Sequence, residues 1–314
     1  MIILPYNDKI KLNYFTGGDT LAESYTHSLN ALAAAAQAKY IPRDKTSFLM
    51  GSNGPDPMFY YKIYNPFRSY DLAILGDIMH IKKTGVFLKN LFLNARTDIQ
   101  KDYCLGFLCH YALDSAIHPF VNYISQAYGS PFNIPRGHNY FETALDCALS
   151  QKYLHTSCPD IEEYAPEMTD SQLVQISYLL KRTVDLTYYE HDFPQEEYAR
   201  CFKDFRFIRK FLHSPGKTKF PIALIIEKII GKGDGFIMGR MQPCNMPISD
   251  FTFWQDKTTG LYYADSLEDI LHRADLLAAK YIDLGLAFFR GQISIEDFAE
   301  EIGSRSYDAG FAAY

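Results

Sequence analysis

The sequence predicts an all-α fold, and three observations lead to this prediction. Most long segments carry apolar residues at helical spacing, with capping or stop residues at their ends. No convincing run alternates apolar and polar residues, as half-buried strands do. The composition is ordinary for a globular protein, with 47% hydrophobic and 22% charged residues, and 314 residues can bury a large core. We therefore expect a single multi-helix domain over residues 1–314.

Four helices are expected in the first half of the chain. The first begins at Asp19 or Thr20, either of which can cap it, and stops before Pro42. The third contains Pro119, which can kink the helix just after His118. The helices after the first should span residues 69–94, 97–123 and 137–153.

The segment 51–57, GSNGPDP, should be a loop because its two glycines and two prolines do not suit a helix interior. It presents Asp56 between two prolines, just before the aromatic residues 59–61. An aspartate in such a loop commonly accepts hydrogen bonds from backbone N–H groups of a turn. An aromatic run is commonly core, although it can also form an apolar rim. Both alternatives stay open at this point.

The second half is also mostly helical. Its clearest helix spans residues 266–289, where Ser266 caps an amphipathic segment and Asp269 holds the matching position of a capping box. An irregular stretch around Trp254 precedes this helix. The other helices of this half should span residues 170–189, 195–212, 221–230 and 294–302.

The charge pattern argues against stable binding of nucleic acid. The chain has 31 basic and 37 acidic residues, a net charge of −6, and no basic run that would follow a phosphate backbone. Six cysteines are scattered without a C-x-x-C pair, so we expect no disulfide framework. Cys104, Cys109 and Cys147 lie in apolar helical surroundings and should pack in the core.

The N-terminus lacks a basic segment followed by an apolar one, which a secretory signal would have. No stretch reaches the roughly 18 apolar residues of a transmembrane helix. We therefore expect a soluble, cytoplasmic protein with reduced cysteines.

The segment GFLCHYALDSAIHP carries the strongest chemical pattern. It places His110, Asp114 and His118 at i, i+4 and i+8, so in a helix all three side chains lie on one face. Two imidazoles and a carboxylate converging from one face can bind a transition metal. His138 and Glu142 repeat the i, i+4 spacing on the next expected helix. A chance ion pair explains one such pair but hardly two consecutive helices with the same arrangement.

Two other motifs indicate a function only weakly. The glycine-rich loop at residues 231–236 superficially resembles a phosphate-binding loop, but it follows a helix and lacks the Lys-Ser/Thr pair. The dipeptide His191-Asp192 suggests a phosphohydrolase of the His-Asp domain type, although it lies at a helix end. His27 and His80 alone would be read as exposed or core histidines.

Taken in order, however, the motifs resemble those of the zinc-dependent phospholipase C superfamily, which includes the single-strand-specific zinc nucleases of fungi and plants. The chain is most similar to bacterial, cytoplasmic-type members. The matching motifs cover roughly the first half and are Thr26-His27, the G-x-x-G-P-D-P loop at 51–57, G-D-x-M-H at 76–80, the stretch 106–119, and H-x-x-x-E at 138–142.

The resemblance implies an α-helical metal-binding half at residues 20–155 and a helical half at 165–314, with two or three Zn²⁺ ions. It also implies a zinc-bound hydroxide that attacks a phosphodiester in line, with Asp56 as the catalytic proton acceptor. One zinc would be held by Asp56, His80, His110 and Asp114, a second by His118, His138 and Glu142, and a third by His27 with Asp114 as a bridge.

The chain departs from the secreted members in ways that bear on its function. Their mature N-terminal Trp helps to bind the third zinc, whereas this chain begins with Met1 and its His27 lies far from the terminus. The two aromatic positions of the phosphatidylcholine-specific enzymes are Pro57 and Asp77 here. Asp146, at i+4 from Glu142, should support His138 or another ligand.

These observations lead to one preferred function and two alternatives. The preferred function is a zinc-dependent phosphodiesterase that acts on a phospholipid or another small phosphodiester, with transient contact to a membrane surface. The alternatives are a single-strand nuclease on the same scaffold and a non-catalytic, zinc-stabilised binding protein. The natural substrate and the oligomeric state do not follow from the sequence.

Overall fold

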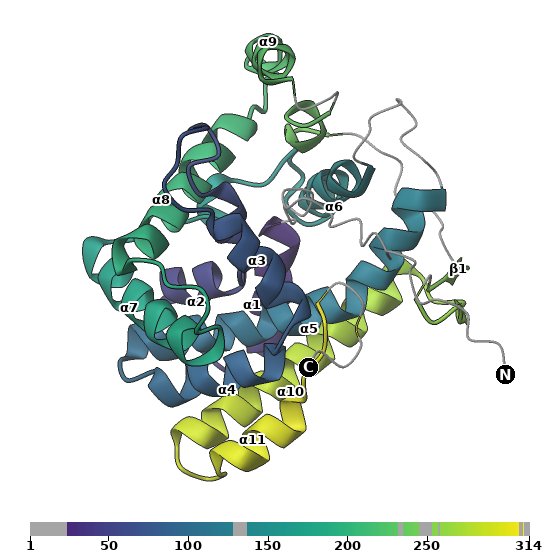
Figure 1. Ribbon diagram of the computed structural model, residues 1–314. Coiled ribbons are helices and arrows are strands. Elements are labelled where there is room, and N and C mark those ends of the chain that lie inside the picture. The colour runs from purple at the N-terminus through teal and green to yellow at the C-terminus, as the bar shows by residue number, and fades with distance from the viewer. Residues whose placement is uncertain are drawn as a thin grey trace, which may run out of the picture.

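The computed structural model describes residues 24–127, 137–231, 235–244, 253–256, 258–307 and 310, and this part of the chain is mainly α-helical, as predicted. Figure 1 shows the helices gathered around α5. The α-helices are α1 Ser24–Gln37, α2 Lys45–Gly51, α3 Leu72–Ile81, α4 Thr84–Asn94, α5 Asp98–Ala127, α6 Gly137–Leu154, α7 Asp170–Thr187, α8 Gln195–Leu212, α9 Phe220–Ile230, α10 Leu267–Phe289 and α11 Ile295–Ile302. The described residues also form the short 3-10 helices η1 Asp56–Tyr60, η2 Ile161–Glu163 and η3 Met238–Arg240.

Helix α5 is the centre of the fold. It packs against α10, α2, α1, α6, α7 and α4, and nearly every side chain from Asp102 to Ile124 is buried. Its contact with α2 is backbone to backbone: a Cβ added at Gly106 would lie 2.0 Å from the carbonyl oxygen of Phe48. Glycine is therefore required where the two helices cross. This position brings the motif-bearing turns of α5 next to the 51–57 segment.

The expected helix over residues 69–94 is wrong, because the structure has two helices there. Helix α3 ends before Lys82, and Lys83 adopts a left-handed backbone conformation with φ of 52°. The start of α4 is fixed by a distant segment instead: Thr84 Oγ1 donates to the carbonyl of Arg305, and Gly85 N donates to Ser304 Oγ. Tertiary contacts thus override a continuous helical pattern.

The expected loop at 51–57 is also partly wrong. Gly51 is the last residue of α2, and Asp56 begins η1 directly after Pro55. Phe59, Tyr60 and Tyr61 are buried, so they belong to the core and form no apolar rim. A proline before a short 3-10 helix pre-sets the backbone, which holds Asp56 more rigidly than a loop would.

A small antiparallel sheet lies where the sequence predicted irregular structure. Strand β1 (Trp254–Gln255) pairs with β2 (Tyr262–Tyr263), with Trp254 opposite Tyr263. The rings of Trp254 and Tyr263 stack with centroids 4.6 Å apart. Two residues per strand are too few to produce an alternating pattern in the sequence.

Helices α5 to α11 lie close to the residue ranges predicted from the sequence. The long helix around Pro119 runs without interruption through that proline, from Asp98 to Ala127. The capping box of Ser266 and Asp269 is present at the start of α10. The expected start of the first helix at residues 19–23, the loop before α6 and residues 232–234 lie outside the described residues.

The core joins both halves of the chain. The main cluster of buried hydrophobic side chains runs from Tyr25 of α1 to Tyr307 beyond α11. Cys104, Cys109 and Cys147 are buried with free thiols, as predicted. The single-domain organisation over residues 1–314 stays a prediction. Within the described ranges, every helix is too short or too polar to cross a membrane.

Candidate metal centre

The eight predicted ligands meet in one buried cluster. They come from five elements that pack together, and α5 supplies three of them from one face. His27 lies on α1, Asp56 starts η1, His80 lies near the end of α3, His110, Asp114 and His118 lie on α5, and His138 and Glu142 lie on α6. The spacing predicted which side chains share a helix face, and the packing of the helices brings the faces together.

Asp114 lies at the centre of the cluster. Its Oδ1 atom is 3.1 Å from His27 Nε2, and its Oδ2 atom is 2.9 Å from His110 Nε2. His80 Nε2 and His118 Nε2 lie 3.7 Å from Oδ2 and Oδ1, respectively. The carboxylate therefore contacts imidazoles from three helices.

The side chains divide into three groups whose ligand atoms lie within 4.8 Å of one another. The first two groups share His110, and Asp114 links them to the third through His118. In the third group, His138 Nε2 lies 2.6 Å from Glu142 Oε1. The groups are His27, His110 and Asp114; Asp56, His80 and His110; and His118, His138 and Glu142.

Several polar atoms of the cluster have no hydrogen bond among the described residues. They are both carboxylate oxygens of Asp56 and Asp114 and both ring nitrogens of His110, although all three side chains are at most 1% exposed. A buried polar group without a partner costs about 1–3 kcal/mol. Imidazole nitrogens and carboxylate oxygens that face one another without hydrogen-bond geometry can be satisfied by a cation between them. The cluster can therefore hold metal ions.

Hydrogen bonds outside the cluster turn two imidazoles toward it. His80 Nδ1 donates to the carbonyl of Gly76 at 2.7 Å, and His118 Nδ1 donates to the carbonyl of Tyr307 at 3.1 Å. A carbonyl only accepts, so Nδ1 carries the proton and Nε2 presents its lone pair to the cluster. This arrangement is typical of metal-binding histidines.

Asp146 holds the segment that carries His27. Its carboxylate accepts hydrogen bonds from Thr26 N at 2.8 Å, Thr26 Oγ1 at 2.9 Å and Tyr25 N at 3.2 Å. Burial raises the pKa of Asp146, while Arg209 and these donors oppose that shift. Asp146 thus fixes the first turn of α1, from which His27 projects.

The electrostatics of the cluster favour a charged carboxylate at Asp114 and a neutral imidazole at His110. Burial alone would raise the pKa of Asp114, but the imidazoles of His110, His118 and His27 outweigh burial and hold this pKa well below its usual range. Burial lowers the pKa of His110 despite the nearby carboxylates. An anionic aspartate and a neutral histidine are the protonation states that bind a metal.

Tyr307 also contacts the cluster, although it was not among the residues predicted from the sequence. Its backbone N donates to the carbonyl of His80 at 2.7 Å, and its own carbonyl accepts from His118. Its buried ring lies 5.4 Å from the ring of His80 and 5.5 Å from that of His110. No local signal marks this residue, because its partners lie 189 or more positions earlier in the chain.

Gly54 sets the position of His110. Its φ is +51°, and a Cβ there would lie 2.1 Å from the His110 ring. We expect Gly54→Ala to reduce metal content and to lower the free energy of unfolding by roughly 2 kcal/mol or more, from backbone strain and overpacking. Denaturant unfolding and metal analysis measure both effects. Gly216→Ala is the matched control, since its nearest neighbour would be 3.7 Å away; equal effects of the two substitutions would contradict the prediction.

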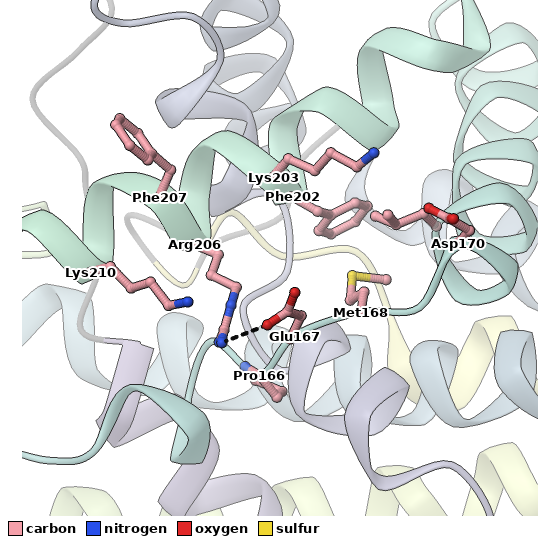
Figure 2. Close-up of a pocket in the computed structure, with 10 residues that line it drawn as sticks. Pro166, Glu167, Met168, Asp170, Phe202, Lys203, Arg206, Phe207 and Lys210 are labelled. Carbon is pink, nitrogen blue, oxygen red and sulfur yellow. Dashed lines mark hydrogen bonds and ion pairs between the residues drawn. The ribbon is translucent and has the colours of Figure 1, made fainter.

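A surface hollow of about 410 Å³ lies elsewhere, between α8 and the segment that leads into α7. Figure 2 shows Lys203, Arg206 and Lys210 on α8, facing Glu167 and Asp170. Arg206 Nη2 lies 3.3 Å from Glu167, so opposite charges partly neutralise each other. None of the eight predicted ligands lines this hollow. The hollow and the cluster are therefore separate features.

Comparisons with protein-family models, with curated proteins and with solved structures find no match to this chain. The cluster is therefore the feature of this chain that bears most directly on its function.

Proposed function

We propose that this protein is a zinc-dependent phosphodiester hydrolase, similar in its chemistry to phospholipase C. The observation that carries the proposal is the position of Asp114 among imidazoles from α1, α3 and α5, with further ligand groups on both sides. A site for two or more metal ions requires adjacent groups of ligands with at least one residue in common. Five imidazoles and three carboxylates, without a thiolate, suit zinc.

The contacts support the ligand sets that the resemblance implies. Asp56, His80, His110 and Asp114 would hold one zinc, and His118, His138 and Glu142 a second. His27 lies 3.1 Å from Asp114 and would complete a third position. Zinc bound here would supply positive charge that polarises a phosphodiester and makes a nearby water more acidic.

Two of the chain's own residues have further roles. Asp56 has both carboxylate oxygens free of hydrogen bonds among the described residues, and it would accept the proton of an attacking water. His138 is the most exposed ligand, with 20% of its side chain accessible, while the other seven side chains are at most 4% accessible. Substrate would therefore approach from the side of His138. A phospholipid or another small phosphodiester is the proposed substrate.

The same burial also favours one alternative, a non-catalytic protein that zinc stabilises. A cluster in which seven of eight ligands are almost inaccessible could serve stability alone.

The test combines metal analysis with hydrolysis. We expect two or three zinc ions per chain and zinc-dependent turnover of bis(p-nitrophenyl) phosphate and of a short-chain phospholipid. His110→Ala should lower turnover by roughly 100-fold or more, whereas His272→Ala, at an exposed position of α10, should not. Zinc at full occupancy without turnover would support the non-catalytic alternative, and carefully purified protein without zinc would exclude both. Faster cleavage of single-stranded DNA than of lipid would favour the nuclease.

A further inference from the structure

Helix α9 exposes an aliphatic surface. Ile222, Ile225 and Ile229 are 56%, 58% and 78% exposed, and Leu224 and Ile230 are exposed beside them. A water-facing helix surface normally carries polar side chains. Neighbouring exposed aliphatic residues on one short helix therefore mark an interaction surface.

The other face of α9 is firmly attached to the protein. Ala223 packs against Leu212 and Met241. The buried carboxylate of Glu227 accepts hydrogen bonds from Gly235 N at 3.0 Å, and from the backbone N–H groups of residues 237 and 238 at 2.6 and 2.8 Å. Figure 1 shows α9 at the edge of the molecule, at the top of the view. The aliphatic surface is thus a projecting ridge on a fixed helix.

The exposed charges on α9 and just before it are positive. Between residues 217 and 231, the exposed charged side chains are Lys217 and Lys228, whereas the only acid, Glu227, is buried. This local excess of cations contrasts with the net charge of −6 for the whole chain. An aliphatic ridge flanked by lysines matches the boundary between acyl chains and anionic headgroups.

We infer that α9 docks onto an anionic lipid surface, with Ile222, Ile225 and Ile229 entering the acyl boundary. Its 11 residues span about 16 Å, far less than the roughly 30 Å of a hydrocarbon core, so the helix lies along the surface. A second copy of the chain fits less well, because the flanking lysines would repel one another. The ridge also lacks the Trp, Tyr and Arg side chains that dominate protein interfaces. The inference does not depend on the proposed zinc chemistry.

Vesicle binding by the full-length chain tests this inference. We expect cosedimentation with phosphatidylcholine vesicles that contain phosphatidylglycerol, weaker binding without phosphatidylglycerol, and weaker binding at high salt. Ile229→Glu combined with Ile225→Glu should reduce the partition coefficient roughly tenfold or more, and Lys228→Glu should reduce it for the anionic vesicles. Val174→Glu is the matched control, because Val174 is 59% exposed on α7.

The remaining outcomes would overturn the inference. Failure to bind anionic vesicles would do so, as would equal effects of the control and the α9 substitutions. A dimer in analytical ultracentrifugation that Ile229→Glu dissociates would assign the ridge to a second copy instead. The assay measures partition and needs no turnover, so its result is independent of whether the cluster hydrolyses a phosphodiester.

Discussion

Asp114→Asn should remove most of the bound zinc and lower zinc-dependent hydrolysis on the order of 10³-fold. Asp114 contacts His27 and His110 through different oxygens, at 3.1 and 2.9 Å, so it would serve more than one metal position at once. Asparagine keeps the shape of the side chain but offers one neutral oxygen and one NH₂ donor. The donor would face imidazole lone pairs or a cation, and the shared negative charge would be lost.

Metal content per chain and initial rates on a chromogenic phosphodiester measure this effect. Asp283→Asn, at an exposed position of α10, is the matched control and should change neither quantity. Circular dichroism shows whether the Asp114 variant still folds, and a parallel Asp56→Asn variant separates the roles of the two carboxylates. If the Asp114 variant kept full zinc and full activity, the central role of this carboxylate would be wrong.

The sequence was most informative where one helix carried the chemistry. His110, Asp114 and His118 share a face because their spacing places them there, whatever the rest of the fold does. His138 and Glu142 follow by the same reasoning on α6. The spacing of residues predicts a shared face once the segment is known to be helical. In this chain the apolar periodicity and the capping residues predicted these helices clearly.

The contributions that depend on tertiary contacts could not be predicted in the same way. Tyr307 contacts His80 and His118 through its backbone, which leaves no trace in residue type. The break between α3 and α4 depends on bonds from Thr84 and Gly85 to residues more than 200 positions later. The carboxylate of Asp146 reaches Thr26 across 120 positions, and its i+4 spacing from Glu142 gives no sign of this partner.

Charge balance argues for two zinc ions more strongly than for three. Asp56, Asp114 and Glu142 contribute three negative charges, and burial favours the neutral form of His110. Two Zn²⁺ ions would leave a net charge of +1, which a phosphodiester monoanion neutralises. Three ions would leave +3 in a buried site, and a buried charge without compensation is costly. We therefore expect the position at His27 to be the weakest of the three.

Removing the metal should lower the thermal midpoint of unfolding by about 15 °C, because each of two tight sites contributes about 4 kcal/mol at free zinc near 1,000 times its dissociation constant. The physical reason lies in the cluster. Without a cation, the buried oxygens of Asp56 and Asp114 have no hydrogen bond among the described residues, and both side chains are shielded from solvent. The metal-free protein must then move these groups toward water or protonate them, and either change opposes the packing around α5.

Calorimetry of the zinc-loaded, chelator-treated and zinc-restored protein measures the shift. Zinc should restore the midpoint, whereas Mg²⁺ should not, because it prefers oxygen ligands and five of the eight ligands here are imidazoles. His110→Ala provides the control for chelator effects unrelated to the cluster, since its midpoint should already be low and should respond little. A midpoint that stays unchanged after complete metal removal would mean that the cluster is satisfied by its own hydrogen bonds, and the argument from its unpaired buried atoms would fail.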